Sequence, residues 1–306
     1  MEVSSKGIKE KAAELGFDLC GIAKVRILTE YESVIKDWIT KGYHNGMKYL
    51  ARDIPKRLNP ESLLPGAKSV VVTGLNYYSE NMQKVPGSPV ISRYAYGTDY
   101  HVIISSRLKA LLKWIQSVDP TASGRITVDS APILEKAWAM EAGLGYPGRN
   151  SIIINKKIGS FFFIGTIILN LELEYDNPAG EDLCGNCRIC TGECPTRAIN
   201  DNRTINTERC IANLTIEKRD PAPPELRSCL GLRIFGCDRC QEVCPWNKNA
   251  IQNNIPEFKL SDEIAGMSLD DWRTLSLEKF LRLFGKSPLG RTGYEKLMRN
   301  IDAATG

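Results

Sequence analysis

Hydrophobic and polar positions in the first part of the chain follow two different spacings. Residues 8–15 place apolar side chains on one face of a short helix, which Gly16 would end. Residues 69–75 form a run of mostly β-branched apolar residues, which is typical of a buried strand. Between residues 101 and 118 apolar side chains return at a helical spacing, and this predicts a longer helix.

The next segments predict more strands and one more helix. Residues 125–129 read as a short strand, and Pro132 suits the first turn of a helix over residues 133–142. Residues 151–155 and 160–170 are rich in β-forming residues, and residues 156–159 would join them as a hairpin. These patterns predict an α/β or α+β core that extends to about residue 175.

The composition changes after this core. Nine of the ten cysteines fall between Cys184 and Cys244. From residue 251 the chain becomes polar, with helical segments around residues 268–284 and a basic segment over residues 286–299. We therefore expect three parts: residues 1–175, residues 176–250 and a helical, basic C-terminal segment, residues 251–306.

Overall composition excludes several classes of protein. With 42% hydrophobic and 25% charged residues, the chain is too apolar to be disordered, and a net charge of +4 neither requires nor excludes an anionic partner. The N-terminus has no hydrophobic signal region or twin arginine, and the longest apolar stretch, residues 160–171, is too short to span a bilayer. A cytoplasmic protein is therefore expected, in which clustered cysteines indicate metal or redox chemistry.

The cysteines have the spacing of a bacterial ferredoxin. The first motif is CxxCxxCxxxCP from Cys184 to Pro195, and the second, CxxCxxxCP from Cys237 to Pro245, lacks one cysteine that Cys210 can replace. In such proteins the last cysteine of each run ligates the other [4Fe–4S] cluster. The predicted ligands are Cys184, Cys187, Cys190 and Cys244 for the first cluster, and Cys194, Cys210, Cys237 and Cys240 for the second.

A zinc ribbon is the structural alternative, but it requires neither the further cysteine of each run nor the repeated Cys-Pro ending. Cys20 and Cys229 remain outside the two sets and receive no role. The long segment before the motifs should hold the catalytic centre or electron acceptor that two clusters would serve.

The N-terminal half contains no dinucleotide-binding or P-loop glycine motif. His44 and His101 are the only histidines, which is too few to indicate a two-histidine metal site. Each is interpreted as an ordinary hydrogen-bonding residue. Asp129 lies where a strand ends and a helix begins, the edge at which α/β proteins place ligands. From position alone, a helix cap formed by Asp129 or Ser130 is favoured over catalysis.

Several segments, taken together, resemble one family. They are residues 42–50, 56–60, 64–70, 93–101, 128–132 and 231–247, which follow one another over about residues 40–250. In these segments the chain resembles the epoxyqueuosine reductases, cobalamin-dependent iron–sulfur enzymes of tRNA queuosine synthesis. The resemblance implies an α+β fold, with an α/β-type cobalamin-binding domain followed by a ferredoxin-like domain with two [4Fe–4S] clusters.

The resemblance also implies roles for individual residues. Base-off cobalamin would lie between the first domain and the cluster domain, and Asp129 would be the catalytic acid. Lys136 would lie near the substrate. Contacts to cobalamin are implied for Asp129, for the side chains of Arg57, Arg93 and Asp238, and for the backbone of Ile153 and Ile164.

The sequence departs from the family in two places. Residues 145–150 read GYPGRN, and Pro147 alters a loop expected beside the corrinoid. The chain ends at Gly306, whereas longer members carry a C-terminal helical-repeat domain that grips tRNA. This short form would leave tRNA binding to the cluster domain and the basic tail.

The implied activity is reduction of the epoxide of epoxyqueuosine to queuosine at the wobble position of tRNA. The partners would be a tRNA anticodon stem-loop and a small low-potential electron donor protein, with no membrane contact, and a monomer is the expected state. Tyr96 or Trp246 would stack on a base or serve only in packing. The candidate phosphate-binding residues, unless they are merely solvated charges, are Lys218, Arg219, Arg227, Arg233, Lys286, Arg291, Lys296 and Arg299.

Two other functions remain open at this level. A related corrinoid enzyme such as a reductive dehalogenase has a similar architecture, although such enzymes usually carry a twin-arginine signal. A non-catalytic electron carrier with two clusters is the other alternative. Binding of cobalamin would separate the enzymes from the electron carrier.

Overall fold

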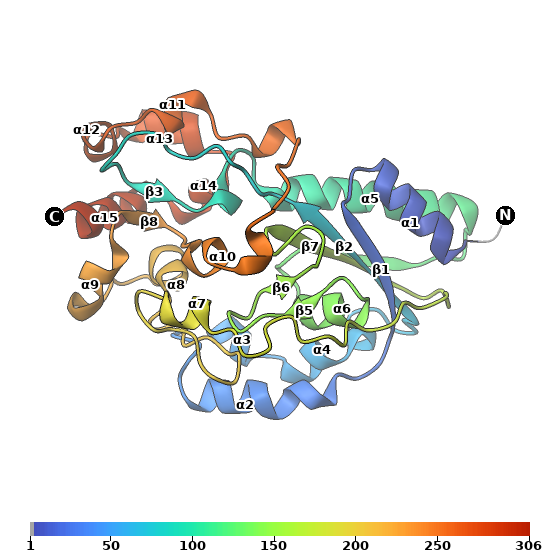
Figure 1. Cartoon of the computed structure of the whole chain (residues 1–306). Helices are drawn as coiled ribbons and strands as arrows, with labels where there is room; N and C mark the ends of the chain where they lie inside the picture. The colour runs from blue at the N-terminus through green and yellow to red at the C-terminus, as the bar shows by residue number, and fades with distance from the viewer. Residues whose placement is uncertain (1–2) are drawn as a thin grey trace.

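The computed structural model describes residues 3–306. Its main sheet has the strand order β1-β2-β7-β4, and all neighbouring strands in it are antiparallel. The elements up to this sheet's last strand are α1 (Ser5–Glu14), β1 (Leu19–Lys24), α2 (Glu32–Thr40), α3 (Lys48–Ala51), α4 (Ile54–Leu58), β2 (Ser69–Asn76), β3 (Val90–Ile91), α5 (Tyr100–Val118), β4 (Gly124–Thr127), α6 (Glu135–Glu141), β5 (Tyr146–Pro147), β6 (Ile153–Ile154) and β7 (Phe162–Leu169) (Figure 1).

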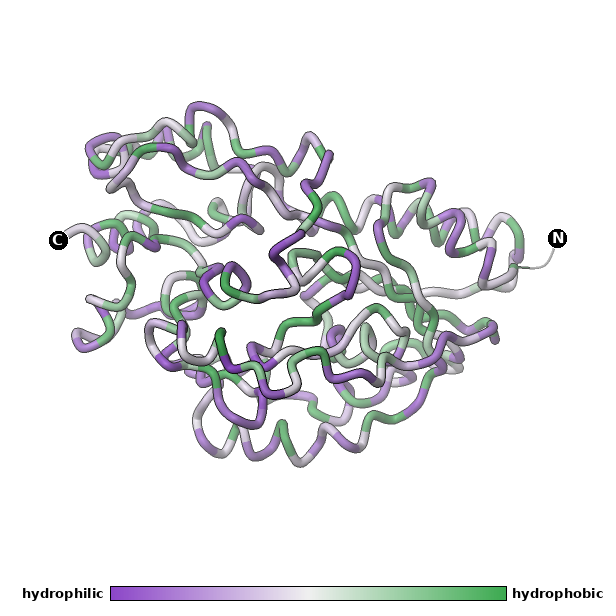
Figure 2. Tube along the Cα trace, in the orientation of Figure 1, coloured by the Kyte–Doolittle hydropathy of each residue, from purple (hydrophilic) through white to green (hydrophobic). Residues whose placement is uncertain are grey.

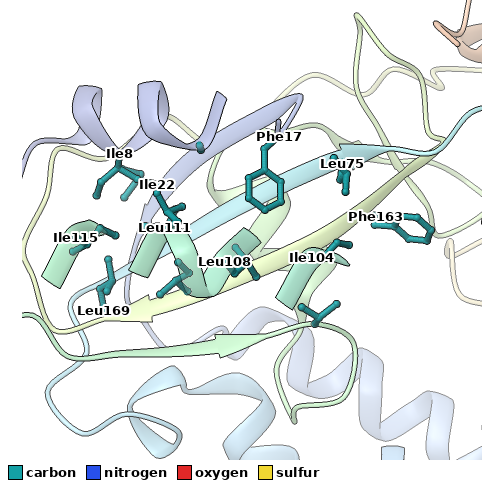
Figure 3. Packing of buried hydrophobic residues seen from close by; sticks show 14 of the residues in the cluster. Ile8, Phe17, Ile22, Leu75, Ile104, Leu108, Leu111, Ile115, Phe163 and Leu169 are labelled. Carbon is teal, nitrogen blue, oxygen red and sulfur yellow. The ribbon is translucent and has the colours of Figure 1, made fainter. Parts of the chain in front are cut away.

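Both faces of this sheet are covered. Val71 and Leu75 of β2 face a hydrophobic cluster that includes α1 and α5, and Figure 3 shows the α5 side chains directed at the sheet. Val70 and Val72 face the opposite cluster, to which α6 contributes Trp138. Because alternate side chains of a strand point to opposite faces, a strand buried on both sides reads as a continuous apolar run.

The predicted helix over residues 101–118 and the predicted strand over residues 69–75 are confirmed as α5 and β2, and the first helix as α1. β1 was not predicted, although it forms the edge of the sheet beside β2. The α+β class is confirmed. The parallel sheet that an α/β-type first domain would have is not found, since the main sheet is antiparallel throughout, and the ligand-edge argument for Asp129 therefore does not apply.

The predicted start of the helix at residue 133 is wrong. α6 begins at Glu135, and Pro132 precedes it in a bent segment. Two successive tight turns form there, with backbone hydrogen bonds from Ser130 N to Val128 O (2.6 Å) and from Ile133 N to Ala131 O (2.8 Å). Leu134 follows with φ −86° and ψ 73°, outside the helical region, so the helix cannot include residue 133 and begins at Glu135.

The predicted hairpin over residues 151–170 is present only at its tip. Asn155 and Gly159 exchange two backbone hydrogen bonds of 2.8 and 3.0 Å. Beyond this tip the strands separate, since β6 pairs with β5 and β7 enters the main sheet. The tip contacts the cluster-motif region, where a Cβ at Gly159 would overlap Asn247.

The regular elements described in the remainder of the chain are helices, apart from the short strand β8. A third hydrophobic cluster joins its C-terminal helices to the parallel pair β3·β8 and to Tyr96. Figure 2 shows apolar and polar positions alternating along these helices. None of the helices in residues 3–306 is both long and apolar enough to cross a bilayer. The elements are α7 (Ile189–Gly192), α8 (Ile211–Ile216), α9 (Pro224–Leu230), β8 (Arg233–Phe235), α10 (Arg239–Glu242), α11 (Asp262–Ala265), α12 (Leu269–Arg273), α13 (Leu277–Phe284), α14 (Pro288–Thr292) and α15 (Tyr294–Thr305).

Candidate active site

A cavity of about 670 Å³ lies between the main sheet's helices and the cysteine-rich segment. Asp129 and Lys136 line it from the N-terminal side, and Cys210 lines it from the opposite side. A second cavity of about 460 Å³ shares Asp129 and Lys136 with the first and includes Arg57. We call these two joined hollows the central cavity. Its further lining residues include Trp38, Met47, Tyr49, Tyr94, Tyr100, Ser151, Thr207, Glu217 and Arg291.

Asp129 occupies a tight turn at the edge of this cavity. Its φ is 59°, in the left-handed region that residues with a side chain seldom adopt. The side chain is 67% exposed, and its Oδ2 accepts a 2.9 Å hydrogen bond from the Tyr100 hydroxyl. Asp129 is not the N-cap of α6, which is Leu134 without a side-chain hydrogen bond. The interpretation of Asp129 or Ser130 as a cap is therefore wrong.

His101 lies beside the same carboxylate. Its Nε2 is 3.7 Å from Asp129 Oδ2, and its Nδ1 is 2.8 Å from Asp99 Oδ1. Arg291 joins this group through a 3.1 Å contact from Nε to Asp99 Oδ2. Because Asp99 orients the imidazole, His101 is a fixed neighbour of Asp129 with one nitrogen directed at it.

Lys136 stands between the carboxylate and the thiols. It is open to the cavity, and its Nζ donates a 2.9 Å hydrogen bond to the Ser151 carbonyl. The surrounding protein lowers the pKa of Lys136 by removing its ammonium from bulk water, while the negative charges of Asp129, Cys240 and Cys210 oppose this effect. Lys136 is therefore close to both halves of the site.

Of the other residues implied for cobalamin, Arg57 is at the central cavity. Its Nη2 donates to the Tyr49 carbonyl at 2.7 Å, and burial lowers its pKa. Ile153 is buried in β6 and Ile164 is half-buried in β7, and both side chains pack in the second hydrophobic cluster. Neither of them lines the central cavity.

Arg93 and Asp238 lie elsewhere. They line a separate cavity of about 490 Å³, next to Cys237. Arg93 Nη1 is 3.3 Å from Asp238 Oδ2 and 2.8 Å from Glu242 Oε1, and Asp238 also accepts the Arg93 backbone N–H at 2.8 Å. Burial raises the pKa of Asp238. The structure does not bring this ion pair into the central cavity with Asp129.

The first set of four cysteines lines one cavity. Cys184, Cys187, Cys190 and Cys244 surround a hollow of about 240 Å³. Burial raises the pKa of the Cys244 thiol, and the negative charges of the other three thiols raise it further. Arg149, from the loop that departs from the family pattern, binds this segment through its Nε to Cys187 O at 2.8 Å and its Nη2 to Gly185 O at 2.6 Å.

The second set is also drawn together. Burial raises the pKa of Cys240, with Cys237 and Cys210 adding to the shift, and burial likewise raises that of Cys210, with Cys194 adding. Cys190 of the first set also raises the pKa of Cys240, so the two sets are neighbours. In residues 3–306 no three or more His, Cys, Asp or Glu side chains are arranged as a site for a single metal ion.

The two remaining cysteines lie outside these sets. Burial raises the pKa of Cys20 to about 12, and its side chain packs against the first hydrophobic cluster. Cys229 is a half-buried residue of α9. Neither lines the central cavity.

Six of the eight predicted basic residues divide into two groups. Lys296 and Arg299 of α15 bind backbone carbonyls: Lys296 Nζ donates to Ile216 O, and Arg299 donates to Arg219 O and, at 3.4 Å, to Lys218 O. Arg227 of α9 likewise donates to Ala222 O, and Arg233 of β8 donates to Leu230 O at the end of α9. Lys218 and Arg219 instead line a cavity of about 560 Å³ beside Tyr49, next to the central cavity.

The two aromatic candidates lie away from the central cavity. Tyr96 is 3% exposed and belongs to the third hydrophobic cluster, so it is a packing residue. Trp246 lines the cavity of the first cysteine set, and its Nε1 donates to Leu183 O at 2.8 Å. For Tyr96 the sequence left open two roles, stacking on a base and packing in a core. The structure supports packing.

Sequence reasoning missed three residues of the site: Tyr100, His101 and Glu135. Glu135 Oε1 accepts the backbone N–H of Asp129 at 2.8 Å. Tyr100 and His101 belong to a segment already matched to the family, but only their position at the start of α5 shows that they face Asp129. Nothing in the local pattern around Glu135 distinguishes it from a solvated carboxylate at a helix start.

Comparison with known proteins agrees with this arrangement. A family model described as "Epoxyqueuosine reductase QueG, DUF1730" matches residues 57–130, and one described as "4Fe-4S double cluster binding domain" matches residues 183–247. An epoxyqueuosine reductase of Leadbetterella byssophila is 46% identical over 97% of this chain and 97% of its own. That of Escherichia coli is 40% identical over 98% of this chain and 80% of its own.

Solved structures show the same likeness. An epoxyqueuosine reductase crystallised with an epoxyqueuosine-modified tRNA-Tyr stem loop has a TM-score of 0.91 and 30% identity, over 98% of this chain and 80% of its own. One from Bacillus subtilis, with its catalytic aspartate loop swung out of the active site, has a TM-score of 0.90 and 29% identity, over the same shares of the two chains. The chain belongs to the epoxyqueuosine reductase family of oxidoreductases.

Proposed function

We propose that this enzyme reduces the epoxide of epoxyqueuosine to the alkene of queuosine at the wobble position of tRNA, with base-off cobalamin and two [4Fe–4S] clusters as cofactors. The observation that carries the proposal is the central cavity, which has the Asp129 carboxylate on one wall and the Cys210 thiol on the other. A proton donor and a cluster ligand thereby face the same space.

The reaction needs both sides of this cavity. Converting an epoxide to an alkene consumes two electrons and two protons and releases one water. When bound, the clusters and cobalamin supply the electrons. Asp129 donates a proton to the epoxide oxygen as its carbon–oxygen bond breaks, and the Tyr100 hydroxyl at Oδ2 orients the carboxylate. Asp129, whose side chain is 67% exposed, takes up the second proton from solvent.

The residues present fit the cofactors. Each proposed cluster has four thiols gathered from separate segments, which is the ligand number that a [4Fe–4S] cluster requires. For cobalamin, the joined hollows offer space between Arg57 and Cys210, with Lys136 between them. Arg57 and Asp129 would contact the corrinoid there. The resemblance adds the backbone of Ile153 and Ile164 and the side chains of Arg93 and Asp238, which lie outside these hollows.

The partners follow from the same site. A solved relative binds an epoxyqueuosine-modified tRNA stem loop. In this chain Lys218, Arg219 and Arg291 lie at or next to the central cavity, where they would contact RNA phosphates. A small low-potential donor protein would deliver electrons to the first cluster, whose cysteine segment is largely exposed.

The test is Asp129→Asn, which keeps the shape of the side chain and removes its acid. The anaerobically reconstituted variant should convert epoxyqueuosine in tRNA at least 10²-fold more slowly, with unchanged iron and corrinoid content. Asp37→Asn is the matched control, since Asp37 forms an exposed pair with Lys41 on α2. Full turnover by the Asp129 variant would contradict its role, and failure of the parent protein to bind cobalamin would favour an electron carrier.

A further inference from the structure

We propose that Glu135 is a positioning residue that holds the Asp129 turn in its active conformation by accepting the Asp129 backbone N–H. This inference rests on the proposed function, because it concerns the delivery of the proton by Asp129. It assigns a part in catalysis to a carboxylate that acts through the backbone of Asp129.

The turn at Asp129 needs an external support. The φ of 59° and the 2.6 Å hydrogen bond from Ser130 N to Val128 O define a three-residue turn with positive φ, a rare and strained form. Such a conformation persists only when surrounding contacts hold it. The contact made by the Asp129 backbone N–H is the 2.8 Å hydrogen bond to Glu135 Oε1.

Glu135 is itself firmly anchored. The same Oε1 accepts a 3.2 Å hydrogen bond from the Thr127 hydroxyl, and Thr127 Oγ1 is 2.7 Å from Thr166 Oγ1. Both threonines are buried in the main sheet, on β4 and β7. Glu135 is also the first residue of α6, whose next turn is buried through Ala137 and Trp138. The sheet and a packed helix therefore support one end of the hydrogen bond.

Two different elements control the catalytic residue. Tyr100, at the start of α5, binds the carboxylate of Asp129, whereas Glu135, at the start of α6, binds its backbone. Loss of the backbone contact would let the turn relax to negative φ, and the carboxylate would then point away from the central cavity. A displacement of about 1 Å at a reacting group is sufficient to slow a reaction about 100-fold.

Two substitutions separate the hydrogen bond from the charge. Glu135→Ala removes the acceptor, and Glu135→Gln keeps an acceptor oxygen in the same place without the charge. Glu141→Ala is the matched control, because Glu141 is at the other end of α6 and its carboxylate pairs with Arg26 and not with the Asp129 turn. The measurements are kcat and KM for tRNA, iron and corrinoid content, and hydrogen–deuterium exchange of the segment that contains the Asp129 amide.

We expect Glu135→Ala to lower kcat about 10- to 100-fold with little change in KM or cofactor content, and to accelerate amide exchange at residues 128–132. Glu135→Gln should restore most of kcat and the slow exchange, and Glu141→Ala should resemble the parent in both. Unchanged exchange in Glu135→Ala would overturn the proposal, as would a Gln variant as impaired as the Ala variant. Because exchange is measured independently of activity, a failure of the proposed reduction would be recognised separately.

Discussion

Glu135 is a carboxyl group in a position that disfavours its charge. Burial, with the adjacent Asp129 carboxylate adding to its effect, raises the pKa of Glu135 from 4.5 to about 7. The folded protein therefore prefers the neutral acid, so ionisation of Glu135 lowers stability as pH rises. This unfavourable contribution to stability is absent below about pH 4.5, which is the pKa of Glu135 in the unfolded chain. It is complete above about pH 7, the pKa in the folded protein.

Glu135→Gln should accordingly be more stabilising at pH 8 than at pH 5. The pKa shift of Glu135 corresponds to a difference in the free energy of unfolding of up to about 3 kcal/mol between pH 5 and pH 8. The measurement is the Tm of the cofactor-loaded protein at both pH values, relative to the parent. A difference in Tm that is the same at both pH values would show that Glu135 does not titrate in this range.

Arg149 shows how one departure from the family pattern is accommodated. Its guanidinium binds two carbonyls of the first cysteine segment, Gly185 O and Cys187 O, at 2.6 and 2.8 Å. Lysine offers a single nitrogen and does not reproduce this forked geometry.

We expect Arg149→Lys to loosen the first cluster, so that the iron content of purified protein falls from about eight toward about four per chain. Arg188→Lys serves as the control, since Arg188 pairs with Asp201 at the surface of the same region. Equal iron content in the two variants would refute this role of Arg149.

At the scale of secondary structure, α15 caps α8. Its side chains supply donors to the carbonyls at the end of α8 and in the following loop: Lys296 to Ile216 O, Arg299 to Arg219 O, and Asn300 to Thr215 O at 2.8 Å. The final carbonyls of a helix lack partners within it, and α15 satisfies them. Because Cys210 directly precedes α8, this cap also supports the segment that carries a proposed cluster ligand.

Asn300→Ala should therefore be strongly destabilising. Asn300 is buried and also donates to Ile234 O at 3.0 Å, so its loss leaves two buried carbonyls without donors. We expect a loss of about 2–3 kcal/mol in the free energy of unfolding, measured by denaturant titration. Glu295→Ala, at an exposed position of the same helix, should change stability by less than about 0.5 kcal/mol.

At the scale of the whole molecule, the central cavity exists because the cysteine-rich segment packs onto the sheet domain. Asn247 is one link between them: its Oδ1 accepts the Ser160 N–H at 2.7 Å, and its Nδ2 donates to Gln241 O at 2.7 Å. The C-terminal helices close the third core against β3 and β8 (Figure 1). Two of their cations, Lys296 and Arg299, donate to backbone carbonyls.

This arrangement predicts which cations bind RNA. Lys218→Ala should weaken binding of the modified stem-loop and reduce the slope of log affinity against log salt by about one, because one phosphate contact is lost. Lys6→Ala is the control, since Lys6 is exposed on α1, away from the cavity. An unchanged salt dependence for Lys218→Ala would place the RNA-binding surface elsewhere.

The sequence alone was sufficient wherever the information is local. The spacing of the cysteines limits which thiols one loop can supply, and apolar periodicity over one segment predicts α5 and β2. The family motifs added Asp129. The contacts of Asp129 with Tyr100, His101 and Glu135, and the use of Lys296 and Arg299 as carbonyl donors, were decided by tertiary structure. They depend on how separate elements pack, and periodicity within a single segment carries no information about the residues that packing brings opposite each other.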